Sequence, residues 1–312
     1  MAETLRIGAR GSPLSLAQTG LAAQAITAGR PGLTVEIVPI KTTGDKILDT
    51  PLARIGGKGL FVKEIEEALL AGDIDLAVHS AKDLPARLPE GLILGATPAR
   101  ADFRDVLVSA APGGLPGLPA GARVGTSGLR RQAQLLARRP DLEIKPIRGN
   151  LETRLKKIGP EVEAVLLAAA GLDRLGLAPS QAVILSPEEM LPAVGQGVLA
   201  LEIRRDDTRM AELLRPIHHE PTGLALAAER GFLDFWGGGC QLPAAALAEL
   251  ADDRLDLRAL IADPDGRKVL KGRKTGPAAR LSLLEAAELG RELAADLAAK
   301  GGAEIMREVS GP

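Results

Sequence analysis

The chain has 312 residues, with 39 basic and 40 acidic side chains and a formal net charge of −1. This length exceeds one average domain and predicts two or three domains. The balanced charge and the 2% of aromatic residues disfavour nucleic-acid binding, because neither a basic surface nor a base-stacking platform is indicated. One cysteine cannot form an internal disulfide, and with three histidines it gives no metal-ligand cluster. Without a signal peptide or a long apolar run, the chain is expected to be cytoplasmic.

The first third of the chain alternates predicted strands with predicted helices, which implies a parallel or mixed sheet. The expected strands are residues 5–9, 34–40 and 76–80. A helix is expected to start at Ser12 and Pro13, with the serine as the cap and the proline in the first turn. A second helix is expected at residues 61–70. The long polar stretch at residues 42–59 is either a lid over a site or a tolerated insertion.

A second α/β unit begins near Asp105. Its expected strands are residues 105–110, 122–127 and 143–148, its expected helices are residues 128–139 and 150–158, and a buried segment follows at 164–172. One more strand is expected at residues 198–203. The last hundred residues differ from this pattern and predict an α+β domain. Its expected elements are a helix at 227–236, a hairpin around Asp265-Gly266 and a long helix at 281–300.

The strongest local signal is basic. Between positions 123 and 154, three acidic residues accompany eight cationic ones, Arg123, Arg130, Arg131, Arg138, Arg139, Lys145, Arg148 and Arg154. Two arginines, Arg130 and Arg131, follow a turn at a predicted helix start, where free N–H groups and the helix dipole favour an anion. Arg148 and Arg154 follow the next strand, so all four could converge on one anionic ligand. The alternative is a solvated helix face, which suits Arg138 and Arg139 better.

Two further groups of polar residues could belong to a site. Arg10 follows the first predicted strand and could join such a crevice. Lys58 lies in the glycine-rich stretch, but the sequence there is no phosphate-binding P-loop. The segment VHSAKDLP places Asp83 at a strand end, where a carboxylate could stabilise developing positive charge. Alternatively, Asp83 pairs with Lys82 or caps a helix.

The cysteine, Cys240, follows three glycines in the segment WGGGCQLP. Glycines allow a backbone to approach a ligand closely, so this thiol could be a nucleophile or an attachment point. The alternative is a small buried apolar residue, which is the usual environment of a free cysteine.

Taken together, these segments resemble the porphobilinogen deaminase, or hydroxymethylbilane synthase, family. The resemblance runs through nearly the whole chain in eight ordered blocks, RIGARGSPLSLAQT, GDKILDTPLARIGGKGLFVKEIE, DLAVHSAKDLP, VGTSGLRRQAQL, IRGNLETRL, AAAGLDRLGL, LPAVGQGVLALEIR and GGGCQLP. It departs from the common TSSLRRQ pattern at Gly128, which replaces a serine.

The resemblance implies two α/β lobes like those of periplasmic binding proteins, with a hinged cleft, plus a smaller C-terminal α+β domain. The implied domains are residues 1–98 with 195–217, residues 99–194, and residues 218–312. The implied activity is a transferase of tetrapyrrole biosynthesis, which condenses four porphobilinogen molecules head to tail, with loss of ammonia, to hydroxymethylbilane. The implied enzyme is a cytoplasmic monomer without membrane or nucleic-acid partners.

The resemblance also assigns roles to residues. A dipyrromethane cofactor would be bound through a thioether to Cys240, Asp83 would be the catalytic carboxylate, and Phe61 would lie at the base of the lid. The residues implied to bind cofactor or substrate are Arg10, Ser12, Lys58, Ser80, Lys82, Thr126, Ser127, Arg130, Arg131, Arg148, Gly149, Arg154, Arg174 and Gln196. No metal is implied. The competing hypothesis is a non-catalytic protein that binds a small anion in a two-lobed cleft, which would explain the arginines but not Cys240 or Asp83.

Overall fold

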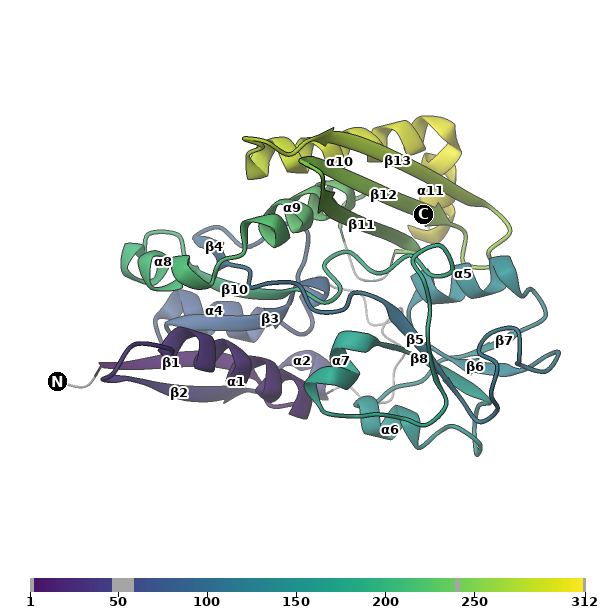
Figure 1. Ribbon diagram of the computed structural model, residues 1–312, viewed down its shortest axis with the longest axis horizontal. Helices are drawn as coiled ribbons and strands as arrows, with labels where there is room; N and C mark the ends of the chain where they lie inside the picture. Colours follow the sequence, from purple (N-terminus) through teal and green to yellow (C-terminus); the bar gives the residue numbers. More distant parts are fainter. Residues whose placement is uncertain (1–2, 47–58, 239–241, 311–312) are drawn as a thin grey trace.

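The computed structural model describes residues 3–46, 59–238 and 242–310. The described chain forms two five-stranded mixed sheets and a three-stranded antiparallel sheet, each accompanied by helices (Figure 1). The predicted fold class, two α/β lobes and a smaller α+β domain, is therefore confirmed. No helix in these ranges is long and apolar enough to span a membrane.

The first lobe is built on the sheet β2-β1-β3-β10-β4. Its strands are β1 (Glu3–Arg10), β2 (Leu33–Ile40), β3 (Leu76–Ser80), β4 (Leu92–Ala96) and β10 (Leu199–Arg204). Its helices and turns are α1 (Pro13–Thr27), α2 (Thr43–Lys46), α4 (Lys63–Ala71), η1 (Ala81–Asp83), α8 (Thr208–Leu214) and η2 (Arg215–Ile217). Strand β10 returns from the second lobe and pairs antiparallel with both β3 and β4.

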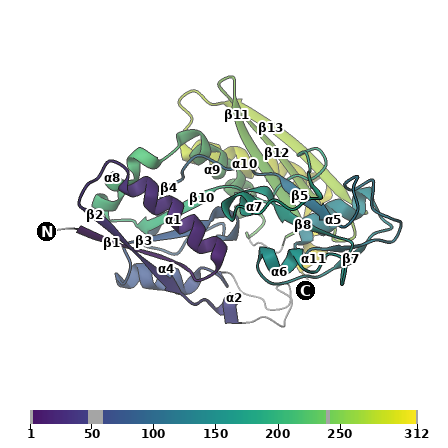
Figure 2. The same ribbon diagram turned by 60° about the horizontal axis from the view of Figure 1, so that its bottom comes forward.

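The second lobe is built on the sheet β7-β6-β8-β5-β9. Its strands are β5 (Asp105–Ser109), β6 (Arg123–Gly125), β7 (Glu143–Lys145), β8 (Ala164–Ala168) and β9 (Ala182–Ile184). Its helices are α5 (Leu129–Arg138), α6 (Leu151–Leu155) and α7 (Ala169–Arg174). In each sheet one strand runs antiparallel to both of its neighbours, since β10 lies between β3 and β4 and β5 lies between β8 and β9. The chain therefore crosses between two lobes of the same topology, and α1 of the first lobe contacts α7 of the second (Figure 2).

The third domain packs its sheet against α9 and α10. Its elements are α9 (Glu220–Phe235), β11 (Ala244–Ala251), β12 (Arg254–Ala262), β13 (Val269–Pro277), α10 (Leu283–Leu297), the π-helical turn η3 (Ala298–Gly302) and α11 (Ala303–Ser310). Ala246 and Ala248 of β11 face the core formed with α9 and α10, whereas Ala245 and Leu247 face Ala133 of α5. Successive residues of a strand point to opposite faces of the sheet. One face of β11 therefore contacts the helices α9 and α10, and the other face contacts the second lobe.

Close contact between α9 and α10 requires two glycines. A Cβ atom on Gly231 would lie 2.0 Å from the carbonyl oxygen of Ala287, and one on Gly290 would lie 2.0 Å from that of Ala228. Phe232 fills the adjoining core and is fully buried. Substitution of either glycine would therefore push the two helices apart.

The predicted elements agree with the structure in most places. The helix start at Ser12 is confirmed, because its side chain caps α1 by accepting the N–H of Ser15 at 3.3 Å. The hairpin around Asp265-Gly266 is confirmed as β12 and β13. The elements that were not predicted are the strands β4, β9 and β11, the helices α2, α8 and α11, and the short turns η1, η2 and η3. In the expected lid stretch, α2 and Gly59 are described, and residues 47–58 lie outside the described residues.

Candidate active site

Three hollows meet at the segment from Ser80 to Asp83, which leaves the end of β3 and forms the turn η1. Their volumes are about 50, 60 and 170 Å³. Ser80 borders the first and second, Lys82 the second and third, and Asp83 the first and third. The segment singled out by its sequence is thus the centre of one continuous site.

The first hollow lies in the first lobe, between the end of β1, the start of α1 and α4. It contains Arg10, Ser12, Phe61, Ser80 and Asp83 of the predicted set. The guanidinium of Arg10 forms an ion pair with Asp45 and lies 4.2 Å from the centre of the Phe61 ring. These two contacts anchor Arg10 beside the segment expected to form the lid.

The second hollow lies between the lobes and is strongly cationic. Its charged lining residues are Lys82, Arg131, Arg154 and Arg174. Arg154 donates from Nε to the carbonyl oxygen of Gly149 at 2.8 Å, and Arg174 donates to that of Gly197 at 2.8 Å. Since carbonyl oxygens carry no full charge, these contacts orient the guanidinium groups and leave their positive charge for a ligand.

Burial, and to a smaller extent the neighbouring cations, lowers the pKa values of two of these groups. Burial lowers the pKa of Lys82 to about 8; Arg131 and Arg130 lower it further, while Asp83 and Asp105 oppose the shift. Burial likewise lowers the pKa of Arg154 to about 10, with Arg131 adding to the shift and Asp83 opposing it. Buried cations of this kind gain from the negative charge of a ligand, so a polyanionic ligand would be stabilised here.

The third hollow is lined by all three domains. Arg130 and Gln196 of the predicted set line it with Lys82, Asp83 and Arg131. Leu233 of α9 and the residues Leu242 and Ala244 complete its wall. Leu242 is the first described residue after the gap at 239–241, so the chain that carries the cysteine leads directly into this wall.

A buried carboxylate, Asp105, organises the arginines of the third hollow. Its oxygens accept N–H groups from Arg130 at 2.8 Å, from Arg131 at 2.7 Å and from Gln196 at 2.9 Å. Burial alone would raise the pKa of Asp105, but the charges of Arg130 and Arg131 hold it well below its usual range. A single negative charge thus fixes two arginines without neutralising both.

Four predicted residues do not line these hollows but shape the turns beside them. Thr126 is buried and its hydroxyl accepts the N–H of Gly128 at 3.3 Å, whereas the Ser127 hydroxyl donates to the carbonyl of Ile147. Gly149 adopts a φ of 106°, a conformation that favours glycine. Arg148 lies close enough to Arg154 to lower its pKa. These residues position the arginine-bearing turns.

Arg138 and Arg139, which suit a solvated helix face better in the sequence, make contacts outside the three hollows. Arg138 donates to the carbonyl of Glu188, and Arg139 pairs with Asp141 at 2.7 Å. Neither lines any of the three hollows. Two further predicted residues, Lys58 and Cys240, lie outside the described residues.

The sequence reasoning did not single out three polar groups that support the site. Asp105 opens an otherwise apolar strand, and a carboxylate in such a strand signals a buried cationic partner. Gln18 of α1 donates to the Ser80 hydroxyl at 2.8 Å, one turn and a half after the predicted cap. The buried imidazole of His79 lies 3.0 Å from a carboxylate oxygen of Glu202.

The chemistry of this site follows from its charges. Asp83 is the one carboxylate among the described lining residues of the three hollows, and six cations accompany it, Arg10, Lys82, Arg130, Arg131, Arg154 and Arg174. The cations suit a ligand with several carboxylates. The lone carboxylate can accept an N–H group or stabilise a positive charge that develops during a reaction.

Comparisons with solved structures give similarities of low identity. The periplasmic VFT2 domain of Bordetella pertussis BvgS is 15% identical with a TM-score of 0.40, covering 68% of this chain and 85% of that one. An ancestral cationic amino acid solute-binding protein, AncCDT-1, is 16% identical with a TM-score of 0.44, covering 68% and 87%.

Comparisons by sequence extend over the whole chain. A porphobilinogen deaminase of Syntrophobacter fumaroxidans is 48% identical over 98% of this chain and 97% of its own. One of Syntrophotalea carbinolica is 52% identical over 97% and 95%. The family model "Porphobilinogen deaminase, dipyromethane cofactor binding domain" matches residues 5–212, and "Porphobilinogen deaminase, C-terminal domain" matches residues 224–299. The chain therefore belongs to the porphobilinogen deaminase family.

Proposed function

We propose that this chain is a hydroxymethylbilane synthase, in which Asp83 performs the chemistry inside a cationic cleft between the lobes. The reaction joins four porphobilinogen molecules head to tail with loss of ammonia. The observation that carries the assignment of roles is the position of Asp83, the lone lining carboxylate, among six cations. In a site that only binds anions, a carboxylate at that position would repel the ligand, whereas in the proposed reaction it stabilises positive charge.

The residues present fit a dipyrromethane with its carboxylate arms. Lys82 and Arg154, whose pKa values are lowered by burial, would be stabilised by such carboxylates, and Arg131 and Arg174 lie in the same hollow. When bound, the dipyrromethane supplies the pyrrole end to which new units are joined. We propose Cys240 as its thioether anchor, because the chain after the cysteine enters the wall of the hollow that Asp83 borders.

The protein's own groups then have distinct tasks. Asp83 accepts the pyrrole N–H group of porphobilinogen and stabilises the positive charge that remains on this ring when ammonia leaves. It can also take up the proton released when the new carbon–carbon bond forms. Arg131, Arg154 and Arg174 hold carboxylate arms, and Arg10 and Phe61 close the first hollow beside the proposed lid.

The remaining assignments are also proposals. Residues 1–98 with 195–217, residues 99–194 and residues 218–312 would form three domains that move about the two crossovers. Lys58 would reach the site from the lid stretch. The enzyme would be a monomer in the cytoplasm, where a reducing environment preserves a single cysteine.

Intact-mass spectrometry of the purified protein tests the anchor. We expect the native chain to exceed its sequence mass by one dipyrromethane and the Cys240→Ala variant to have its unmodified mass. The variant should release no ammonia from porphobilinogen. An active native enzyme of unmodified mass would contradict the anchor, and a loaded enzyme without ammonia release would contradict the reaction.

A further inference from the structure

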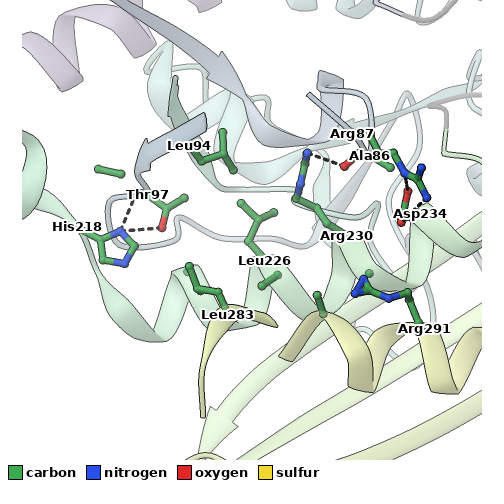
Figure 3. Close-up of a pocket in the computed structure, with 15 residues that line it drawn as sticks. Ala86, Arg87, Leu94, Thr97, His218, Leu226, Arg230, Asp234, Leu283 and Arg291 are labelled. Atoms are coloured by element: carbon green, nitrogen blue, oxygen red, sulfur yellow. Dashed lines mark hydrogen bonds and ion pairs between the residues drawn. The ribbon is translucent and has the colours of Figure 1, made fainter. Parts of the chain in front are cut away.

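A separate cavity lies at the junction of the first lobe and the third domain. Its volume is about 260 Å³, larger than any of the three hollows of the site. Strand β4, helices α9 and α10 and the segment with Ala86 and Arg87 surround it (Figure 3). None of its lining residues borders the three hollows around Asp83.

The middle of this cavity is apolar. Leu94, Leu226 and Leu283 line it together with four alanines, Ala86, Ala96, Ala227 and Ala287. In Figure 3, Leu94 and Leu226 lie on the side of the first lobe and α9, and Leu283 lies across from them at the start of α10. Leu283 keeps 51% of its surface exposed, so the apolar lining continues to the mouth of the cavity. An apolar ring could bury its faces here.

One end of the cavity is cationic. Arg87, Arg230 and Arg291 line it with Asp234, which is paired with Arg87 at 2.6 Å. Arg291 is paired with Glu288, a carboxylate outside the lining, at 2.9 Å, so within the described residues Arg230 is the one of the three arginines without a carboxylate partner in an ion pair. Arg230 is half-buried, and its hydrogen bond goes to the carbonyl oxygen of Ala86 at 2.8 Å. Burial lowers the pKa of Arg230, whereas the charges of Glu202 and Asp234 oppose the shift. A desolvated guanidinium of this kind gains from an anionic partner.

The opposite end carries a neutral hydrogen-bonding group. The Nδ1 atom of His218 accepts the backbone N–H of Thr97 at 3.2 Å, so in the neutral ring the proton lies on Nε2. The burial of His218 lowers its pKa, with Glu220 opposing the shift, which favours this neutral form. The ring rests against Gly223, where a Cβ atom would lie 2.8 Å from Cε1.

We propose that this cavity binds a small aromatic carboxylate, with the ring between the leucines and the carboxylate directed to Arg230 and Arg291. The volume suits one ring and not a tetrapyrrole, since larger ligands occupy cavities of roughly 300–1,000 Å³. The proposal concerns a second site and does not depend on the reaction assigned to the first.

Such a ligand would touch the first lobe and the third domain at once. Ala86 and Arg87 follow Asp83 closely in the chain, and they line the cavity opposite α10. Gly238 is the last described residue before the cysteine segment, and it packs tightly against Ala86. A Cβ atom added to Gly238 would lie 2.3 Å from the Cβ atom of Ala86. The occupied cavity would therefore hold together the two segments that carry Asp83 and Cys240.

Isothermal titration of the native holoenzyme with phenylacetate, and with the uncharged phenylacetamide, tests the proposal. We expect saturable binding of phenylacetate and at least about tenfold weaker binding of the amide, because the charged hydrogen bond to Arg230 is lost. The absence of saturable phenylacetate binding would overturn the proposal. Equal binding of the two probes would also overturn it, since the arginines would then have no role.

Three variants locate the probe. Arg230→Met should weaken phenylacetate binding at least about tenfold by removing the charge while keeping an apolar stem. Ala287→Leu should weaken it by filling the cavity, and this change leaves the arginines in place if Arg230→Met fails to fold. Arg154→Met, in the active-site cleft, should leave phenylacetate binding unchanged. If Arg154→Met alone lost phenylacetate binding, phenylacetate would bind in the cleft, and the proposal would be overturned. These titrations do not measure porphobilinogen turnover.

Discussion

Asp83 lines the candidate active site and makes few contacts that stabilise the fold. It is half-buried at the border of two hollows, and within the described ranges no hydrogen bond ties it to another residue. Ser80, three residues earlier, makes no side-chain cap on the turn η1 and instead accepts a hydrogen bond from Gln18. The alternative role of Asp83 in a capped helix entry therefore lacks its main contact, and its carboxylate is available for a ligand.

An Asp83→Asn variant separates chemistry from folding. We expect it to keep the native unfolding temperature, because it preserves shape and removes no hydrogen bond to a described residue. Its turnover of porphobilinogen should fall at least about a hundredfold, because an amide does not stabilise positive charge or accept a proton. Steady-state kinetics and thermal unfolding measure both effects. Native turnover in this variant would remove Asp83 from its proposed role.

Glu66 carries the clearest pH-dependent stability in the described chain. Burial raises the pKa of Glu66 to about 7, Glu202 adds to the shift, and His79 opposes it. Since this pKa lies above the unfolded value, the folded state holds the proton more tightly, and its stability falls as pH rises from about 4.5 to about 7. At higher pH the folded state contains an ionised carboxylate with a buried, unpartnered oxygen among the described residues.

Replacing Glu66 by Gln should remove this dependence. We expect Glu66→Gln to match the native protein at pH 5 and to exceed its free energy of unfolding by about 2 kcal/mol at pH 8. Urea unfolding at several pH values measures the difference. Glu67→Gln, on the same helix with its carboxylate 61% exposed, should show no comparable divergence. A constant difference for Glu66→Gln across this range would contradict the raised pKa.

At the scale of elements, the helix α5 is held in position by a carboxylate on the strand β5. The helix begins at Gly128 without a side-chain cap, and its first two arginines both bind Asp105 at the start of β5. Arg130 also donates to the carbonyl oxygen of Leu191 at 2.8 Å, in the segment that leads back to the first lobe. Asp105 therefore positions the arginines and joins α5 to the returning chain.

Asp105→Asn should uncouple this arrangement. We expect it to lower the free energy of unfolding by about 3–5 kcal/mol, because two buried guanidinium groups lose their shared counter-charge. It should also reduce the fraction of protein that has the dipyrromethane mass. If Asp105 only stabilised the fold and did not position the arginines, this fraction would not fall. Asp102→Asn weakens a pair with Arg104 that is partly exposed to solvent and should cost less than about 1 kcal/mol. Full cofactor loading in Asp105→Asn would contradict the positioning role.

The elements that the sequence predicted carry strong local signals. The start of α1 combined a capping serine with a proline, and the α10 capping box between Ser282 and Glu285 likewise marks a helix start. Strand β11 was missed because AAALAELA consists mainly of residues that favour helices. It forms a strand because β12 pairs with all eight of its residues and both its faces are buried. Tertiary contact, which no local pattern reports, decides its structure.

The site shows the same limit. Arg131 and Arg154 were identified from the basic cluster and Arg174 from the family resemblance, and the structure brings all three to one hollow. The buried partner Asp105 and the supporting Gln18 were not identified, since they act through contacts separated by many residues in the chain. Local sequence patterns predict ligand-facing side chains more readily than the groups that hold them.

At the scale of the whole molecule, one buried carboxylate joins both crossovers to the third domain. Glu229 of α9 is fully buried and accepts Nη1 of Arg100 at 2.6 Å, in the segment that leaves the first lobe. It also accepts the N–H of Gly195 at 2.7 Å, on the returning segment, and that of Ala248 in β11 at 2.9 Å. Glu229 thus contributes to the placement of both crossovers against the third domain.

Glu229→Gln tests this dependence. The amide keeps the size of the side chain but leaves the Arg100 guanidinium without its counter-charge, and its NH₂ group would face donors that need an acceptor. We expect the free energy of unfolding to fall by about 3–5 kcal/mol, measured as a lower urea midpoint. Glu249→Gln, which changes a carboxylate of β11 that is 42% exposed and paired with Arg258, should cost less than about 1 kcal/mol. Equal midpoints for the two variants would contradict the role of Glu229 in joining the three parts.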